Sequence, residues 1–264
     1  MDTNTDVILL VGGKSSRYNS ESDNKDRGNK PKSFHKIKNK YLIIHCMENF
    51  INYGFYNFIL PIGYYEDIFK KKFKEIKFIK KIKCNTYFDN KEYIKKKNIN
   101  KSKKEINILL LKTYKKSNKS ERIIRVVKKL NINKLFVSYG DGVGDLDIKK
   151  LYESHTNNVK NIMTVASLRP YSQYGHFFFK KNKVINFIEK PQLDKWVNIG
   201  YFYLNIKSIK FIEKFVKKDL EMGALKHIAK IGKLNIYKHK GFWKSVDTLK
   251  DAIELNNLLA KMKK

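Results

Sequence analysis

The sequence predicts an α/β fold built on a doubly wound, mostly parallel sheet, with a small antiparallel sheet in its second half. Short apolar runs alternate with segments of helical periodicity as far as residue 166, which is the order of strands and helices in a parallel sheet. The first run, Val7 to Val11, is wholly apolar and stops at Gly12-Gly13. Such a run is typical of a strand that is buried on both faces and ends in a tight turn.

The other elements are predicted from the same patterns. Segment 20–29 is polar and aperiodic, which predicts a loop, and segment 85–104 is polar and weakly patterned. With 264 residues, the chain is long enough for one α/β domain and short for two, so we expect residues 1–264 to form one domain. Strands are predicted at 7–11, 58–62, 106–111, 135–137 and 163–166, antiparallel strands at 177–179, 184–188 and 201–203, and helices at 41–53, 68–78, 122–130, 147–155, 209–216 and 248–262.

The composition is strongly basic, with 57 Lys and Arg against 25 acidic residues and a formal charge of +32. Such a balance suits a nucleic-acid binder or a protein that handles anionic substrates. The lysines are nevertheless spread over almost every segment, which favours a compositional habit over a designed patch. The dense runs, such as 70–72 and 95–97, lack the interleaved aromatic residues of a base-stacking surface. Nucleic acid is therefore not the expected partner.

The two cysteines and the hydropathy pattern bear on the compartment. Cys46 and Cys84 stand apart, so neither a zinc cluster nor a disulfide framework is indicated. No apolar run approaches the roughly 20 residues that cross a bilayer, and the N-terminus lacks the pattern of a signal peptide. We expect a cytoplasmic protein without a membrane partner.

The turn after the first strand reads Gly12-Gly13-Lys14-Ser15-Ser16-Arg17. Glycines allow backbone amides to approach a phosphate, and basic side chains neutralise it, so a triphosphate is one expected ligand. It is not a P-loop, because that motif needs a glycine where Ile8 stands. A turn without a ligand is the alternative.

A second motif, Tyr139-Gly140-Asp141-Gly142, follows the predicted strand at 135–137. It places a carboxylate at the carboxyl end of a buried strand, where open α/β sheets bind ligands. The following residues do not fit a calcium loop. The alternative for Asp141 is a turn in which the carboxylate accepts local amides.

A second candidate carboxylate, Asp247, precedes the last predicted helix, where an aspartate is usually an N-cap. Thr248 to Asp251 already forms a capping box, however, which leaves Asp247 available. Two carboxylates can share one Mg²⁺ whose remaining ligands are nucleotide phosphates.

Lys32 and Lys190 each adjoin a proline, which stiffens the backbone, although in so lysine-rich a chain either could be incidental. The six histidines form no metal-binding or nucleophilic pattern.

Taken in order, these segments resemble the sugar-phosphate nucleotidyltransferases, and most closely the glucose-1-phosphate cytidylyltransferases. The resemblance spans nearly the whole chain and implies a Rossmann-like nucleotidyltransferase fold. Its nucleotide-binding part would cover about 1–150 and its sugar-phosphate-binding part about 151–264. The segments that carry it are 12–17, 30–32, 58–64, Tyr-Gly-Asp-Gly-Val at 139–143, Phe-Ile-Glu-Lys-Pro at 187–191, Asn-Ile-Gly-Tyr-Phe at 198–202, Gly-Phe-Trp at 241–243 and Asp-Thr-Leu at 247–249.

The resemblance also implies roles for individual residues. Asp141 and Asp247 would bind Mg²⁺, while Arg17 and Lys32 would bind the triphosphate. Lys190 would bind the incoming phosphate, and Asn198 would face the sugar hydroxyl groups. The remaining positions that it implies are Gly12, Gly13, Ser16 and Gly140 around the nucleotide, and Gly175, Glu221 and Arg122 around the acceptor.

The implied reaction transfers a cytidylyl group from CTP to a sugar 1-phosphate or a similar small phosphate, with release of pyrophosphate. A phosphate monoester is already a nucleophile at neutral pH, so positioning and charge neutralisation would supply the catalysis. The product would be destined for a surface glycan. The resemblance also implies a homo-oligomer.

Two departures from the family pattern concern the glycine loops. Ser15 and Ser16 replace a glycine and a threonine in the first turn, and the loop after it is longer. Lys119-Ser120-Glu121-Arg122 stands where the family has Thr-Gly-Gly-Arg, so only the arginine is kept. Side chains in place of glycine narrow a pocket wall. The alternatives are therefore a catalytically impaired nucleotide-binding homologue and a uridylyl or thymidylyl transferase.

Overall fold

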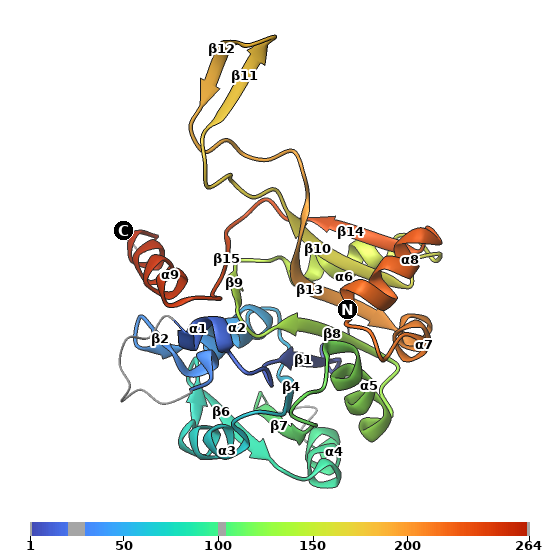
Figure 1. Ribbon diagram of the computed structural model, residues 1–264. Helices are drawn as coiled ribbons and strands as arrows, with labels where there is room; N and C mark the ends of the chain where they lie inside the picture. The colour runs from blue at the N-terminus through green and yellow to red at the C-terminus, as the bar shows by residue number, and fades with distance from the viewer. Residues whose placement is uncertain (1, 21–29, 100–103, 263–264) are drawn as a thin grey trace.

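The computed structural model describes residues 2–20, 30–99 and 104–262, which form a nine-stranded central sheet with helices on both faces (Figure 1). The strand order is β14-β10-β13-β8-β1-β4-β7-β6-β5. The strands are β1 Asp6–Leu10, β4 Asn57–Ile62, β5 Phe78–Ile79, β6 Ile82–Tyr87, β7 Ile106–Lys112, β8 Lys134–Tyr139, β10 Met163–Leu168, β13 Val197–Asn205 and β14 Leu234–Lys238.

The sheet is mostly parallel, as the sequence predicts. β1 pairs in parallel with both β4 and β8, while β13 runs antiparallel to both of its neighbours, β8 and β10. The antiparallel strand expected at 201–203 therefore exists, but it lies inside the main sheet. The separate antiparallel pairs are β11 (His176–Lys180) with β12 (Lys183–Ile188), β15 (Trp243–Ser245) with β9 (Gly142–Gly144), and β2 (Lys36–Ile37) with β3 (Lys40–Tyr41).

Two hydrophobic layers cover the sheet, because side chains alternate across a strand. Val7 and Leu9 of β1 pack in one buried cluster and Ile8 in the other. The doubly wound arrangement follows from this division. The first cluster includes α2 (Leu42–Ile51), α3 (Glu66–Glu75) and α6 (Ile148–Thr156), and the second includes α4 (Asn90–Ile99), α5 (Lys119–Leu130), α7 (Ile206–Lys214) and α8 (Lys226–Lys230).

The weakly patterned segment 85–104 contains the second half of β6 and the whole of α4. Its helix escapes sequence analysis because Tyr93 is its one fully buried side chain among those described. The Tyr93 hydroxyl donates to Asp6 Oδ1 at 2.8 Å, and Lys97 Nζ lies 2.7 Å from Asp6 Oδ2. Polar contacts thus anchor this helix. The loop predicted at 20–29 lies outside the described residues except for Ser20, which ends α1 (Ser16–Ser20).

A two-stranded arm projects from the body (Figure 1). We define it as residues 171–192, which include β11, β12 and the bridge between Tyr171 and Gln192. Most of its side chains are exposed, among them Phe177, Phe179 and Ile185. Within the described part of the chain, no helix combines the length and the apolar character needed to span a bilayer.

The aromatic core provides a test of this packing. Phe50 of α2 is fully buried, with ring centroids 5.9 Å from Phe136 and 5.7 Å from Tyr201. We expect Phe50→Ala to lower the free energy of unfolding by about 3–5 kcal/mol, because it leaves a cavity among these rings. Urea unfolding measures the change. Phe78→Ala, at a side chain that is 65% exposed, should cost about 0.5 kcal/mol or less, and equal losses in both variants would contradict the assignment.

Candidate functional site

The candidate site lies where β1 and β8, adjacent parallel strands, end. The glycine turn at Gly12-Gly13 follows β1, and Gly140-Asp141 follows β8. Adjacent parallel strands bring their carboxyl ends to one edge of the sheet, the usual ligand side of an open α/β fold. Two motifs more than a hundred residues apart in the sequence therefore face one another.

A short antiparallel pair brings Asp247 to the same place. β15 pairs with β9 so that Ser245 lies opposite Gly142, and the Val246 amide donates to the Asp141 carbonyl at 2.9 Å. Asp141 directly precedes β9, and Asp247 follows β15 by two residues. The register of this pair thus places the two carboxylates side by side.

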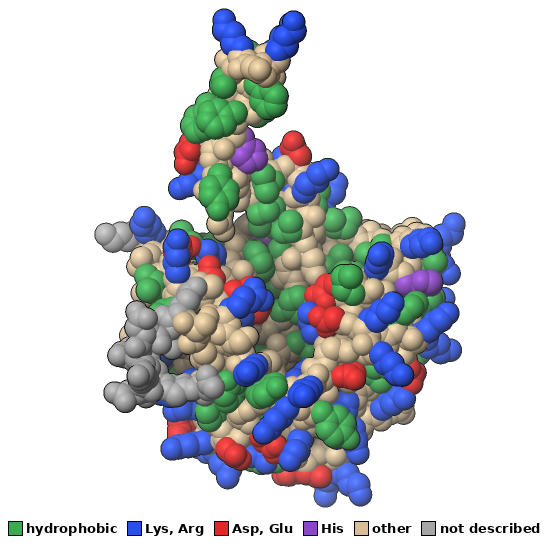
Figure 2. Space-filling view, in the orientation of Figure 1, with side chains coloured by type: hydrophobic (Ala, Val, Ile, Leu, Met, Phe, Trp, Pro, Cys, Tyr) green, Lys and Arg blue, Asp and Glu red, His purple; other side chains and the backbone are tan. Residues whose placement is uncertain are grey.

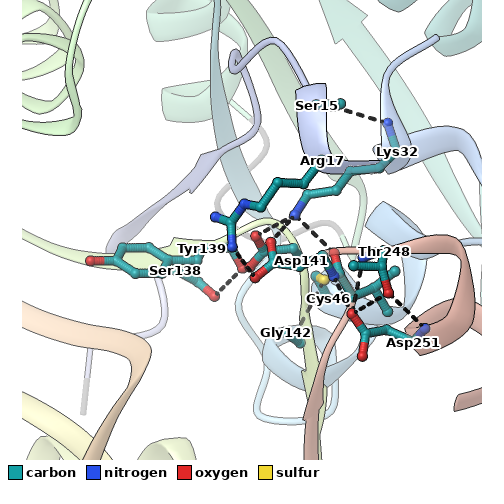
Figure 3. A network of polar contacts seen from close by, with 12 residues as sticks. Ser15, Arg17, Lys32, Cys46, Ser138, Tyr139, Asp141, Gly142, Thr248 and Asp251 are labelled. Carbon is teal, nitrogen blue, oxygen red and sulfur yellow. Dashed lines mark hydrogen bonds and ion pairs between the residues drawn. The ribbon is translucent and has the colours of Figure 1, made fainter. Parts of the chain in front are cut away.

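The Lys32 ammonium lies between these carboxylates, and Figure 3 shows Lys32 and Arg17 pointing towards Asp141. Its Nζ is 2.8 Å from Asp141 Oδ2, 2.9 Å from Asp247 Oδ1 and 2.8 Å from the Val246 carbonyl oxygen. Arg17 Nη1 lies 3.3 Å from Asp247 Oδ2. Burial lowers the pKa of Lys32, but the charge of Asp141 and the hydrogen bonds to both carboxylates outweigh it, and the pKa is raised overall. Lys32 therefore remains cationic.

The two carboxylates fit a magnesium ion that is completed by a substrate. They already share one cation, and each offers oxygen atoms of the kind Mg²⁺ prefers. Among the described residues there is no group of three or more His, Cys, Asp or Glu side chains that could hold a metal alone. The donor set therefore suits Mg²⁺, which usually takes one or two carboxylates and fills its octahedron with phosphates and water.

The capping box predicted at Thr248 is present. Thr248 Oγ1 accepts from the Asp251 amide at 3.1 Å, and Asp251 Oδ2 accepts from the Thr248 amide at 2.9 Å and the Asp247 amide at 3.1 Å. This box starts α9 (Leu249–Lys261). The Asp247 carboxylate is consequently directed to Lys32 and Arg17, because the cap of the helix is made by its neighbour.

The glycines of the site differ in the space around the position of a Cβ atom. A Cβ on Gly12 would lie 2.5 Å from the Pro61 carbonyl oxygen and would overlap Arg122, while one on Gly140 would overlap Val11. Gly13 has no described atom within 4 Å of such a Cβ. Close packing therefore requires Gly12 and Gly140, and Gly13 borders open space where a ligand could approach the backbone.

A pocket of about 620 Å³ opens beside the carboxylates. Figure 2 shows the hollow near the middle of the body, with acidic and basic side chains on both sides. Its volume lies in the range of small-molecule sites. Its lining includes Gly12, Gly13, Arg17, Arg122, Tyr139, Asp141, Asn198, Asp219, Trp243 and Asp247, and a smaller adjoining pocket is lined by Ser16, Lys32 and Gly140 among others.

Arg122 forms part of the pocket wall, and all five of its N–H donors are used within the protein. They reach the carbonyl oxygens of Gly12, Pro61, Lys115 and Ser117 and the hydroxyl of Thr113, at 2.7 to 3.3 Å. A guanidinium has five donors. Arg122 therefore joins the glycine turn to β4 and the loop after β7. Burial lowers its pKa, and its hydrogen-bond donors are committed to the protein.

The replaced glycines leave the pocket open. Glu121 turns back to form a capping box with Asn118, in which Asn118 N donates to Glu121 Oε2 at 2.9 Å. Ser120 is fully buried. Neither side chain lines the pocket, whereas Lys119 does. The departure from the family pattern thus provides a well-capped start for α5 and one new side chain in the wall.

The wall opposite the carboxylates contains two residues that sequence analysis did not select, Lys119 and Asp219. Lys119 Nζ lies 2.5 Å from Asp219 Oδ2. Of the predicted acceptor residues, Asn198 lines the pocket, while Glu221 lies behind it and accepts a hydrogen bond from the Tyr139 hydroxyl. Asp219 belongs to no recognisable sequence motif. Lys119 is one of many lysines in the chain, so the sequence alone does not mark it as a site residue.

Lys190 and Gly175 lie on the arm and outside the pocket lining. The Lys190 ammonium is exposed and has Glu189 at 4.0 Å, and Gly175 packs against Phe187. The structure thus brings together Gly12, Gly13, Arg17, Lys32, Asp141 and Asp247, but it leaves these two predicted residues apart from them.

The fold and the site define an α/β protein with a polar small-molecule site at the carboxyl edge of its sheet, and comparison with known families gives its class. Residues 6–262 match the family described as nucleotidyl transferase. The chain belongs to this family, and the protein is a nucleotidyltransferase.

Individual relatives are similar over nearly their whole length. The chain is 29% identical to the glucose-1-phosphate cytidylyltransferase of Salmonella typhimurium, over 97% of this chain and 96% of that protein. It is 26% identical to a probable glucose-1-phosphate cytidylyltransferase of Bacillus subtilis, over 96% and 95%. Two solved structures share the fold. HddC from Yersinia pseudotuberculosis in complex with GMP-PN has a TM-score of 0.66 at 19% identity, and the match covers 97% of this chain and 99% of HddC. The inositol-1-phosphate CTP transferase of T. maritima has a TM-score of 0.63 at 15% identity, and the match covers 98% of this chain and 96% of that protein.

The fully bonded Arg122 guanidinium predicts a large stability effect. Arg122→Met keeps an unbranched side chain but removes five donors, so buried carbonyl groups lose their partners. We expect the free energy of unfolding to fall by about 3 kcal/mol or more. Arg125→Met on the same helix, which removes one bond to the Lys112 carbonyl near the surface, should cost about 1 kcal/mol or less. Similar denaturation midpoints for the two variants would refute the structural role.

Proposed function

We propose that the protein transfers a cytidylyl group from CTP to a sugar 1-phosphate or a similar small phosphate in a magnesium-dependent reaction. The observation that carries the proposal is the convergence of Asp141 and Asp247 on one cation beside the glycine turn and the pocket. The preference for CTP rests on the names of the relatives. The pocket volume of about 620 Å³ lies in the range of small-molecule sites, which suits a nucleotide or a sugar phosphate.

In the proposed reaction, an oxygen of the acceptor phosphate forms a bond to the α-phosphorus of CTP, and the bond from that phosphorus to the bridging oxygen breaks. Pyrophosphate leaves with the electron pair. Asp141 and Asp247 would hold the Mg²⁺, which supplies charge neutralisation at the phosphates. Arg17 and Lys32 bring positive charge to the same place, and Gly13 leaves its backbone accessible. No general base is required, because the acceptor phosphate is already anionic.

Pyrophosphate release tests this function. With CTP and glucose 1-phosphate, we expect release that requires Mg²⁺ and stops with EDTA. The four ribonucleoside triphosphates, dTTP and a panel of sugar and polyol phosphates define base and acceptor choice. Tight CTP binding without release under any condition would identify a catalytically impaired homologue instead.

Substitution of the carboxylates tests the site itself. We expect Asp141→Asn and Asp247→Asn each to lower kcat/KM at least about 100-fold, because each removes a charge that holds the metal. The matched control is Asp67→Asn on the exposed side of α3, which should keep the wild-type rate. Wild-type turnover in Asp141→Asn would place the chemistry elsewhere.

We further propose that the chain forms a homo-oligomer through its arm. An isolated two-stranded ribbon has little stability of its own, and contiguous exposed apolar side chains mark an interaction surface. Phe177, Phe179 and Ile185 are each more than half exposed. A second copy is the proposed partner, because Lys190, which the family resemblance assigns to the incoming phosphate, lies on the arm and could reach a pocket in another copy.

Light scattering after gel filtration tests the oligomer. We expect a mass at least twice the 31.3 kDa of the chain, and a shift towards the monomer in Phe179→Ser/Ile185→Ser, which removes apolar contacts of the arm. The control is Ile253→Ser on α9, at a side chain that is also more than half exposed. A wild-type monomer, or equal masses for all three proteins, would exclude assembly through the arm.

A further inference from the structure

The end of the pocket away from the carboxylates is built by three segments of the chain. The first turn of α5 supplies Lys119, the end of β8 supplies Tyr139, and the segment before α8 supplies Asp219 and Glu221. Lys119 Nζ lies 2.5 Å from Asp219 Oδ2 and 3.1 Å from Glu221 Oε2, and 5.4 Å from the centre of the Tyr139 ring. One ammonium thus fixes two carboxylates.

These two carboxylates face different surroundings. Glu221 accepts from the Tyr139 hydroxyl through Oε1, and its Oε2 is buried against the Lys119 ammonium. Asp219 lines the pocket, and its side chain is 40% exposed. Asp219 is therefore the carboxylate that faces the pocket, whereas Glu221, whose side chain is 32% exposed, is not a lining residue and contacts Tyr139 and Lys119.

Asp219 retains capacity to accept hydrogen bonds. Its Oδ1 accepts from the Lys119 amide at 3.0 Å and its Oδ2 from the Lys119 ammonium, whereas a carboxylate has about four acceptor positions. Burial raises the pKa of Asp219, but the hydrogen bonds from Lys119 lower it overall, so the group is an ionised acceptor. Hydroxyl groups of a ligand can donate to the remaining acceptor positions of this carboxylate.

Asn198 supplies a donor at the same end. Its Oδ1 accepts from the Gly200 amide at 2.8 Å, and one N–H of its amide nitrogen donates to the Tyr139 hydroxyl, which leaves the second N–H for a ligand. Asn198 also lines the pocket. A donor and an ionised acceptor on one wall match the neighbouring hydroxyl groups of a polyol, because one hydroxyl can accept while the next donates.

We propose that Asp219, held in place by Lys119, determines acceptor specificity by accepting hydrogen bonds from hydroxyl groups of the acceptor. This inference rests on the proposed function and adds a residue to it. The pocket then has two distinct ends. The carboxylate end, with Arg17 and Lys32, takes the phosphates, and the Asp219 end takes the neutral hydroxylated part of the acceptor.

Asp219→Asn is the test variant, because the amide oxygen can still accept from the Lys119 backbone while the charge is lost. With glucose 1-phosphate, we expect the KM of the acceptor to rise about tenfold, and kcat and the KM of CTP to stay within about twofold. Glu213→Gln removes a surface pair with Lys128 and should change none of these constants. Equal changes in the KM of CTP and of the acceptor would overturn the proposal.

Deoxy analogues separate direct contact from a structural effect. We expect at least one of the 2-, 3-, 4- and 6-deoxy glucose 1-phosphates to be about tenfold poorer with the wild type, and its penalty to fall to about twofold in Asp219→Asn. A structural role would weaken all analogues alike and preserve the penalty, which would refute contact. If the enzyme uses a different sugar or polyol phosphate in place of glucose 1-phosphate, the KM of that acceptor is compared between the wild type and Asp219→Asn, and the same rise of about tenfold is expected.

Failure of the Asp219 proposal can be distinguished from failure of the proposed transferase function. If the wild type releases no pyrophosphate with any acceptor, the transferase proposal fails. Calorimetric binding of glucose 1-phosphate then decides the role of Asp219. Binding that weakens about tenfold in Asp219→Asn supports it, whereas unchanged binding, or no binding to the wild type, overturns it.

Discussion

The ammonium of Lys32 is the group on which the candidate site depends. Asp141 and Asp247 lie close enough to contact the same nitrogen atom, and two carboxylates at such separation repel each other unless a cation lies between them. The contact joins three distant parts of the chain, namely the turn after Pro31, the end of β8 and the segment after β15. A site prepared for positive charge is thereby present before any substrate arrives, which suits a reaction between two anionic phosphates.

The two ends of the pocket carry different groups, which suits phosphates at one end and the hydroxyl groups of the acceptor at the other. The carboxylate end carries Lys32 and Arg17, and the opposite end carries Asp219 with Lys119. Arg122 forms part of the wall, with its donors committed to backbone and hydroxyl oxygens. Arg122 therefore acts as a fixed part of the scaffold. The unusual Lys-Ser-Glu sequence before it serves the start of α5 and places one basic side chain in the wall.

The arm gives the molecule a surface whose chemistry differs from that of the body. Its aromatic and aliphatic side chains are exposed on both strands, whereas the body buries its apolar residues in two layers around the sheet. Lys190 lies at the base of this arm. A second copy that covered the arm would bury the apolar side chains and bring a basic residue into reach of another pocket, which links the proposed assembly to the proposed chemistry.

Much of the fold could be predicted from local pattern, because buried parallel strands such as Val7 to Val11 and amphipathic helices leave a direct record in the order of apolar residues. The capping box at Thr248 and the strand-end position of Asp141 were predictable for the same reason. Helix α4 was not, since it is anchored mainly by Tyr93 and by polar bonds to Asp6, a partner distant in sequence. The sequence by itself thus determined the class of fold, the motifs and the family. Only the tertiary structure decided that Lys32 joins the two carboxylates, that Arg122 is fully bonded within the protein, and that Asp219 and not Glu221 faces the pocket, because each depends on contacts between segments that no local pattern connects.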